Sequence, residues 1–571
     1  MIADNLRNVY HSRPFKTRNA DEYDLENILD LFIDPTDGLI GPFEFSNSII
    51  KGKMGSGKTM YLRANYAYYL YTLVPCLIES NPIVLPVYIK LSDFQNIHDP
   101  EKIYYSIIVK IMEEIVAVCR HLQSAEELAR LHTGAKTLTG LWSTDHDFVQ
   151  VLKKLEILTA DEYVETVTNG FSANGSIASD FLKLCTDYEN QTVNEIKRHK
   201  TPSFQDVVDT CDRLLSPFNG KLLLLFDEIG SISKTFFKHT DEGDSYFETL
   251  MNQLRTLSYV RTKLAVYPHS YSDILKETRY GDVVELECDV TNGDTQYTAF
   301  MTKTVSLIER YIEKSSGYKC NAEEVFDLSI TNQLIIEQLI NASEGNMRRL
   351  VHLLDSSMNI AYTRCHGNGR VTLDDVNESL RKQGEEMESQ YPDADRDYLV
   401  SLAKVCRARS TYRFTFPNKS TLIGKYTNMS AEYNVVNIRQ IGSGRQGTVY
   451  SFDYAYCIYR DIPTHYVKDS EKIDKTRSNI HGEPIKRVAQ LSDELLVQSN
   501  IRGKLEGKIV FLSEGNRIGF VETPNGSSYF ITMDSVVSSD RKKQFSIGER
   551  VRFIPVKLDS DSEMAASVEI L

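Results

Sequence analysis

Short apolar runs and longer helical patterns alternate along the first half of the chain. The runs Ser48–Ile50, Ile83–Leu91 and Lys221–Phe226 predict three strands. The last run is continuously apolar, which is typical of a parallel strand that is covered on both faces. Shorter runs at 263–267 and 283–288 predict two further strands, with helical patterns between them. The alternation predicts an α/β fold with a doubly wound parallel sheet.

The remaining sequence divides into regions of different periodicity. Between 98 and 215 the pattern is helical, and the interval is long for a connection between two strands, which favours a helical insertion. Helical patterns return at 293–388, helix mixes with glycine-punctuated strands at 389–500, and five short strands follow at 501–571. We therefore expect four domains, the first of which spans 1–292.

The composition is that of a folded, ordinary globular chain, with 41% apolar and 25% charged residues. The formal net charge of -14 argues against a chain that coats DNA everywhere, although a local basic face remains possible. The nine cysteines include no C-x-x-C pair, so neither a zinc site nor a disulfide framework is expected. The first residues lack an apolar signal core, and the most apolar stretch, 66–90, is interrupted by prolines and an acid. We expect a cytoplasmic protein.

A glycine-rich loop joins the first predicted strand to a helical pattern. Residues 52–59 match the phosphate-binding pattern G-x-x-x-x-G-K-T in the strand–loop–helix context that it requires. The glycines let backbone N–H groups turn inward around phosphates, and the helix that follows adds its positive end. Lys58 is expected to reach the β- and γ-phosphates, and the Thr59 hydroxyl to bind Mg²⁺. The predicted nucleotide-binding residues of this loop are Gly52, Gly55, Ser56, Gly57, Lys58, Thr59 and Met60.

Two acids follow the buried strand at 221–226. Their position puts Asp227 and Glu228 at the carboxyl edge of the sheet, where such sheets bind ligands. Asp227 is expected to bind nucleotide-associated Mg²⁺ through water, and Glu228 to orient and deprotonate the attacking water. The two motifs together predict an ATPase, with ATP and Mg²⁺ as cofactors and ADP and phosphate as products.

These motifs, the strand Lys263–Tyr267 and the stretch Gly345–Leu350 resemble the AAA+ ATPases, and within them the origin-recognition-complex (Orc)-like initiator branch. The resemblance covers roughly residues 30–385 and implies that Arg348 contacts the γ-phosphate from a helical lid, as the family's sensor 2 does. It also implies that Arg279 acts as an arginine finger across a subunit interface. An ordinary structural or solvated arginine is the alternative for both. Residues 268–270 (Pro-His-Ser) depart from the family's Asn or Thr at sensor 1.

A second glycine-rich loop, at 442–449, matches the kinase pattern G-x-G-x-x-G-x-V, but no other kinase motif follows it. A β-hairpin turn between 435–440 and 448–452 explains it better. The surrounding region, 401–472, holds eleven Lys or Arg against five Asp or Glu. It resembles the winged-helix domain of Orc-like ATPases, which implies double-stranded DNA binding; a solvated or protein-docking face is the alternative. Candidate contacts are Arg407, Arg409, Arg413 and Arg445.

The final predicted strands resemble a cold-shock domain over nearly all of 505–571. That family is a five-stranded OB barrel that binds single strands by stacking bases on aromatic rings. The motif at 516–520 lacks one such ring, and the motif at 529–533 lacks a histidine and a phenylalanine. At about 1–3 kcal/mol for each stacked base, these losses weaken the expected binding. The remaining candidates are Phe511, Phe520, Phe530 and Arg517.

The sequence thus predicts an ATP-hydrolysing AAA+ switch that couples nucleotide state to DNA or other nucleic-acid binding. Its expected parts are the nucleotide-binding domain (1–292), the lid (293–388), the winged-helix-like domain (389–500) and the OB barrel (501–571). An arginine finger implies a homo-oligomer or a partner ATPase, and no membrane partner is expected. The alternative is a signalling or scaffold ATPase that assembles a protein effector, such as a nuclease in a bacterial conflict (antiphage) system.

Overall fold

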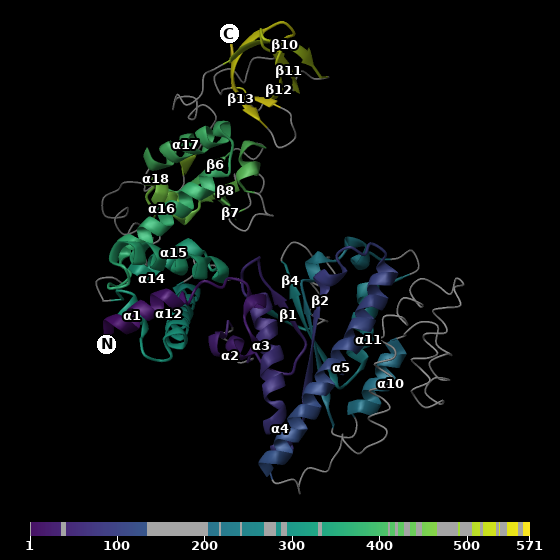
Figure 1. The fold of residues 1–571 in the computed structure, drawn as a ribbon. Helices are drawn as coiled ribbons and strands as arrows, with labels where there is room; N and C mark the ends of the chain where they lie inside the picture. The colour runs from purple at the N-terminus through teal and green to yellow at the C-terminus, as the bar shows by residue number, and fades with distance from the viewer. Residues whose placement is uncertain are drawn as a thin grey trace, which may run out of the picture.

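A computed structural model describes most of the chain. The described residues are 2–35, 41–133, 204–215, 219–239, 243–267, 281–286, 294–328, 334–408, 411–416, 421–427, 434–440, 448–464, 489–490, 505–513, 518–532, 536, 545–557 and 563–571. Figure 1 shows a sheet-containing part, a helical part beside it, a mixed part beyond that, and a small barrel at the end farthest from the sheet.

The predicted parallel sheet is present and has five strands. Its spatial order is β2-β3-β4-β1-β5, and every neighbouring pair is parallel. All five carboxyl ends therefore lie along one edge of the sheet, which is where both phosphate-site motifs begin. The strands are β1 (Ser48–Lys51), β2 (Val84–Lys90), β3 (Lys221–Asp227), β4 (Val260–Val266) and β5 (Asp282–Glu285).

Helices cover both faces of this sheet, which explains the continuous apolar run of β3. Leu222 and Leu224 enter a core shared with α4, α5, α10 and α11, whereas Leu223 and Leu225 enter a core shared with α2 and α3. Figure 1 shows α5, α10 and α11 on one side of the sheet and α2 and α3 on the other. The helices on the two faces are α2 (Leu25–Leu31), α3 (Lys58–Tyr71), α4 (Leu73–Glu79), α5 (Pro100–Thr133), α10 (Phe204–Leu215) and α11 (Tyr246–Thr256).

The interval 98–215, predicted to be a helical insertion, begins and ends with helices of this sheet cover. Ile107 and Ile111 of α5 and Leu214 of α10 are buried in the same core as β3. These two helices thus belong to the connection from β2 to β3, and residues 134–203 lie outside the described part of the chain. Short 3₁₀ segments complete this region: η1 (Ala20–Glu22), η2 (Leu91–Phe94), η4 (Ile229–Ser231) and η5 (Lys234–Phe237).

A helical part follows the sheet, with a core of its own. The first helix of the chain, α1, packs here rather than on the sheet, through Leu6, Val9 and Tyr10. An ion pair of 2.7 Å from Arg13 to Asp355 adds to this contact. The helices are α1 (Ile2–Ser12), α12 (Asp294–Ser316), α13 (Ala322–Val325), α14 (Leu334–Ser343), α15 (Met347–Cys365) and α16 (Leu373–Ser389).

A mixed α/β part comes next, and it contains the predicted hairpin. β7 and β8 pair antiparallel within a sheet of order β7-β8-β6-β9, while the glycine loop at 441–447 lies outside the described residues. The elements are α17 (Asp393–Ala408), β6 (Arg413–Phe416), η9 (Thr421–Tyr426), β7 (Val436–Gln440), β8 (Thr448–Phe452), α18 (Tyr454–Arg460) and β9 (Ala489–Gln490).

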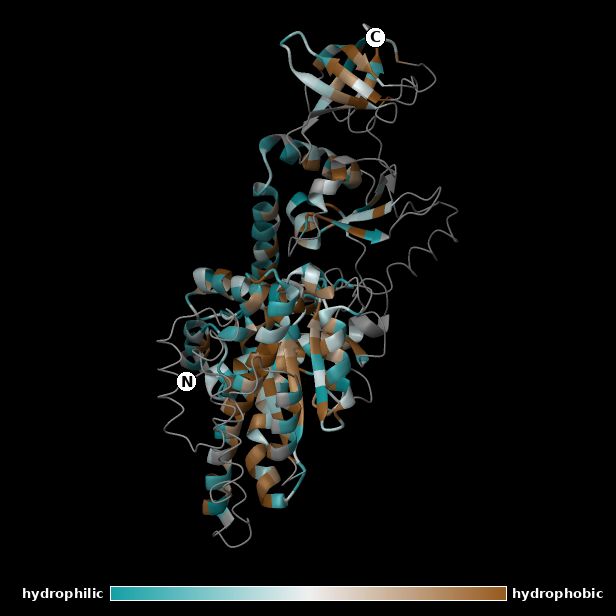
Figure 2. Ribbon diagram, turned by 90° about the vertical axis from the view of Figure 1, so that its right-hand side faces the viewer, coloured by the Kyte–Doolittle hydropathy of each residue, from teal (hydrophilic) through white to brown (hydrophobic). Residues whose placement is uncertain are grey.

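Five strands at the end of the chain form a closed barrel of order β10-β11-β12-β14-β13. Figure 2 shows apolar residues concentrated on the barrel strands and along the central sheet and its helices. Within the described residues, no helix combines the length and apolarity needed to cross a bilayer. The barrel strands are β10 (Leu505–Leu512), β11 (Ile518–Glu522), β12 (Ser528–Thr532), β13 (Arg550–Lys557) and β14 (Glu563–Ile570).

Candidate nucleotide-binding site

The glycine-rich loop between β1 and α3 has the backbone geometry that its sequence predicts. Gly55 and Gly57 have φ values of +78° and +97°, which L-residues with a side chain rarely adopt. At Gly52, a Cβ atom would lie 2.2 Å from the Ser56 hydroxyl oxygen. The Ser56 hydroxyl is itself buried and has no hydrogen-bond partner in the described structure. A buried polar atom of this kind is usually satisfied by a ligand or by water.

Lys58, the first residue of α3, closes the loop on itself. Its ammonium group donates hydrogen bonds to the carbonyl oxygens of Gly52 (2.8 Å) and Lys53 (2.7 Å). The same group lies 4.0 Å from the ring centroid of Tyr267, at the end of β4. The lysine is thus held at the phosphate loop by two carbonyl groups and an aromatic face.

Asp227 is buried at the end of β3 and accepts hydrogen bonds from three elements. Its Oδ1 accepts from the Glu228 backbone N–H (2.8 Å), and its Oδ2 accepts from the Tyr88 hydroxyl of β2 (2.6 Å). Thr59 donates a further hydrogen bond. Burial raises the pKa of Asp227, and these hydrogen bonds oppose the rise. The structure therefore brings Thr59 and Asp227 together, as the sequence predicted.

Glu228 follows directly, with a left-handed backbone (φ +56°, ψ +40°) that is uncommon for a residue with a side chain. Its carbonyl oxygen accepts from the Ser231 hydroxyl at 2.6 Å, and η4 begins at the next residue. This turn places Glu228 in the wall of the pocket that contains Lys58 and Thr59.

The amino-terminal end of α15 lies directly on the phosphate loop. The Asn346 side chain accepts from the Arg349 N–H and so caps the helix, while its amide group donates to the Met54 carbonyl oxygen at 2.8 Å. The Arg348 N–H donates to the Gly55 carbonyl oxygen at 3.1 Å. A Cβ atom on Gly55 would lie 2.4 Å from the Asn346 Oδ1 atom, so this close approach requires glycine.

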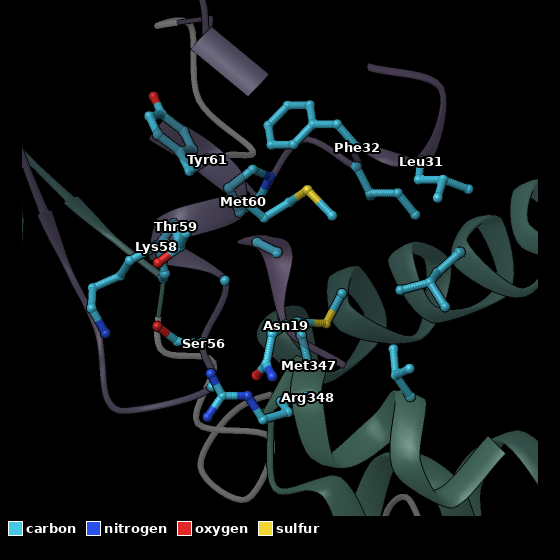
Figure 3. Close-up of a pocket in the computed structure, with 18 of the residues that line it drawn as sticks. Asn19, Leu31, Phe32, Ser56, Lys58, Thr59, Met60, Tyr61, Met347 and Arg348 are labelled. Carbon is cyan, nitrogen blue, oxygen red and sulfur yellow. The ribbon is translucent and has the colours of Figure 1, made fainter. Parts of the chain in front are cut away.

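Ser56, Lys58, Thr59, Glu228 and Arg348 all line one cavity of about 920 Å³ between the sheet and the helical part. Figure 3 shows Lys58, Thr59 and Ser56 on one side and Arg348 extending from α15 toward the loop. Met60, Phe32 and Met347 provide an apolar end. Residues 17–23 also line the cavity; sequence inspection missed them because the polar stretch around them carries no motif.

Some predicted site residues lie outside the described residues, and others lie away from this cavity. Arg279, the sensor-1 region 268–270, Arg409, Arg445 and Arg517 lie outside the described residues. Arg407 is exposed near the end of α17, in the mixed part, and does not line the cavity. Arg413 on β6 donates to the Tyr412 hydroxyl at 2.8 Å and so is partly engaged within the fold.

Two arginines of the locally basic region serve internal contacts. Arg439 donates to Glu344 at 2.7 Å, and Arg460 forms an ion pair with Glu388, so both join the mixed part to the helical part. The positive charge available to a ligand in that region is therefore smaller than the sequence count suggests.

On the barrel, the three candidate phenylalanines lie side by side on adjacent strands. Phe511 pairs with Phe520, and Phe520 pairs with Phe530. Their ring centroids are 6.3 Å and 5.7 Å apart, respectively. Phe511 and Phe520 are 54% and 41% exposed, so their rings are accessible.

Comparison with known proteins relates the N-terminal part of the chain to a known family. Residues 13–82 match the family model ORC-CDC6-like, and this segment contains the whole phosphate loop. Among solved structures, the Aeropyrum pernix ORC2 protein in its ADPNP-ADP complexes matches at 12% identity, covering 76% of this chain and 88% of that chain with a TM-score of 0.33. No curated protein sequence matches. The chain resembles the Orc-like AAA+ ATPases, as its sequence predicted.

Proposed function

We propose that the chain binds and hydrolyses ATP and uses the nucleotide to control nucleic-acid binding by its C-terminal domains. The observation that carries this proposal is the single cavity shared by Lys58, Thr59, Glu228 and the lid residue Arg348. It combines phosphate-binding groups, a candidate general base and a cation supplied by a separate structural part. A site built from two parts is suited to a switch, because a ligand that contacts both stabilises one arrangement of them.

The residues present fit ATP with Mg²⁺. The Thr59 hydroxyl and the Asp227 carboxylate are adjacent hard oxygen donors, which Mg²⁺ prefers, and the ion would neutralise phosphate charge. Lys58 would exchange its two carbonyl partners for phosphate oxygens. The orphaned Ser56 hydroxyl and the N–H groups of residues 55–59 would contact the same phosphates, and Arg348 would contact the terminal one. Glu228 would accept the proton of the attacking water.

We assign the four parts as predicted: an AAA+ domain, a lid, a winged-helix-like domain and a cold-shock-like OB barrel. The hairpin of β7 and β8 behind α17 supports the third assignment. The closed five-stranded barrel with its row of Phe511, Phe520 and Phe530 supports the fourth. In this proposal α17 and the hairpin contact double-stranded DNA, and the aromatic row contacts single strands.

A continuous series of hydrogen bonds provides a route for coupling. Asn346 binds Met54 of the phosphate loop and caps α15 at Arg349. The Arg349 side chain makes two hydrogen bonds with Asp453, at 2.6 and 2.8 Å, and Asp453 caps α18. A conformational change of the phosphate loop on nucleotide binding would thus be transmitted to the winged-helix-like domain through the amino-terminal end of α15.

The decisive experiment is steady-state ATP hydrolysis with and without double- and single-stranded DNA, beside a Lys58→Ala control. We expect DNA to raise the hydrolysis rate of the wild-type protein and Lys58→Ala to abolish hydrolysis in all conditions. Hydrolysis that is indifferent to DNA, with a co-purifying protein, would instead favour the alternative of a signalling or scaffold ATPase. Absence of nucleotide binding in the wild-type protein would contradict both proposals.

A second expected result concerns Arg407 on the exposed face of α17. Replacing it by alanine should weaken binding to double-stranded DNA similarly for all sequences, because a phosphate contact carries no sequence information. The plot of log affinity against log salt should become shallower by about 1, the value for one phosphate contact. Fluorescence anisotropy across a salt series measures this slope. An unchanged slope would exclude Arg407 from the DNA interface.

A further inference from the structure

Tyr88 has a contact with the nucleotide site that its place in the sequence does not reveal. It lies on β2, where the register pairs Tyr88 with Leu225 and Lys90 with Asp227. Side chains two residues apart point to the same face of a strand. Tyr88 therefore lies beside Leu225, two residues before Asp227, on the face of the sheet to which Asp227 also points. Its hydroxyl donates a hydrogen bond of 2.6 Å to the Oδ2 atom of Asp227.

The ring of Tyr88 is fixed by packing as well as by this hydrogen bond. It contacts the Tyr66 ring of α3, with centroids 6.2 Å apart, and borders the core between α3 and the sheet. Phenylalanine would satisfy the same packing. The ring of Tyr88 thus serves packing, whereas its hydroxyl contacts Asp227 of the nucleotide site.

Asp227 depends on that hydroxyl for its orientation. The carboxylate is 1% exposed, so water cannot freely replace a lost donor. The Glu228 N–H, in the turn after β3, donates to Oδ1, and the Tyr88 hydroxyl of β2 donates to Oδ2. Thr59, which is itself a candidate metal ligand, makes the third hydrogen bond. Two donors on the two oxygens determine the rotation of the carboxylate plane, and with it the direction of the lone pairs that remain for a water of the metal ion.

We infer that Tyr88 is a positioning residue for Asp227, and that it sets how strongly Mg²⁺ increases nucleotide affinity. The inference rests on the proposed ATP site and adds a residue to it. Partners that orient metal-binding carboxylates typically change metal affinity about 10–100-fold when they are removed. Tyr88 should therefore matter in the presence of the metal ion and matter little without it.

The test is equilibrium binding of a fluorescent ATP analogue to the full chain, in Mg²⁺ and in EDTA. We expect Tyr88→Phe to reduce the ratio of the two affinities by about tenfold, while affinity in EDTA stays within about twofold of wild type. Tyr66→Phe is the matched control, because it removes a neighbouring hydroxyl that does not bind Asp227. Its ratio should equal that of wild type.

A double-mutant cycle separates positioning from a general packing effect. In an Asp227→Asn background, Tyr88→Phe should cause little further loss, since the group that it orients is already replaced. Equal losses in both backgrounds, or an unchanged ratio in Tyr88→Phe, would overturn the inference while leaving ATP binding by the wild-type protein intact. Tyr88→Met, which also lacks the hydroxyl, provides the same comparison if Tyr88→Phe yields no folded protein. A wild-type protein with no Mg²⁺-dependent binding would instead contradict the proposed function.

Discussion

Replacing Glu228 by glutamine should lower the rate of ATP hydrolysis at least about 100-fold and leave ATP affinity nearly unchanged. Loss of a general base typically costs 10²–10⁴-fold in rate. Glutamine has the same shape but cannot accept the proton of the attacking water. The left-handed backbone that places residue 228 in the cavity wall should persist, because it is set by the strand end and by the Ser231 hydrogen bond.

Two other variants show whether the effect of Glu228→Gln is specific to the hydrolysis step. Lys58→Ala should reduce both hydrolysis and ATP affinity, since Lys58 contacts phosphate in the bound ground state as well. Asp282→Asn neutralises an exposed acid at the opposite, amino-terminal edge of the sheet and should leave both unchanged. Single-turnover hydrolysis together with equilibrium ATP binding distinguishes the three variants. Near wild-type hydrolysis by Glu228→Gln would mean that another group activates the water.

Replacing Asp453 by asparagine should destabilise the contact between the helical part and the mixed α/β part by about 3–5 kcal/mol. That is the usual cost of leaving one partner of a buried ion pair unpaired. The side chains of Arg349 and Asp453 are 3% and 1% exposed, and asparagine would remove the negative charge and one of the two oxygens that accept from Arg349. Amide hydrogen exchange in α15 and α18, monitored by mass spectrometry, should accelerate in this variant.

An exposed ion pair between the same two parts is the control. Arg381 and Asp461 are 3.8 Å apart and both more than half exposed, so Asp461→Asn should cost less than about 1 kcal/mol. Asparagine also suits the left-handed backbone at 461. If Arg349 and Asp453 transmit the nucleotide state, Asp453→Asn should also lose DNA stimulation while retaining basal hydrolysis. Exchange rates equal to those of wild type would refute the energetic argument.

The phosphate loop and the acids after β3 could be predicted because each is a run of neighbouring residues with a fixed context. The parallel sheet followed from the continuous apolar run of β3, whose two-sided burial the structure explains. The hairpin between β7 and β8 followed from its glycines and alternation. In all these cases the information is local, so periodicity and turn composition are sufficient.

The contacts of Tyr88, Asn346 and Arg349 could not be predicted in the same way. The Tyr88 bond depends on the register between two strands separated by more than a hundred residues, and tertiary packing sets that register. Asn346 was recognisable only as part of a family motif, whereas its contact with Met54 requires the lid to be docked. In α1, the apolar positions Leu6, Val9 and Tyr10 have helical spacing, but nothing local indicates that they join the lid.

The packing of α1 on the lid has a mechanical consequence. Residues 2–12 form α1 in the helical part, residues 17–23 line the cavity, and β1 follows in the sheet. The chain connects the sheet to the helical part a second time after β5, because the next described element is α12. A single covalent connection would let the helical part rotate about several axes relative to the sheet. Two connections at separate points leave essentially one axis of rotation and resist twisting of one part against the other. The helical part should therefore rotate relative to the sheet about one axis, so that opening and closing of the cavity follow the same path.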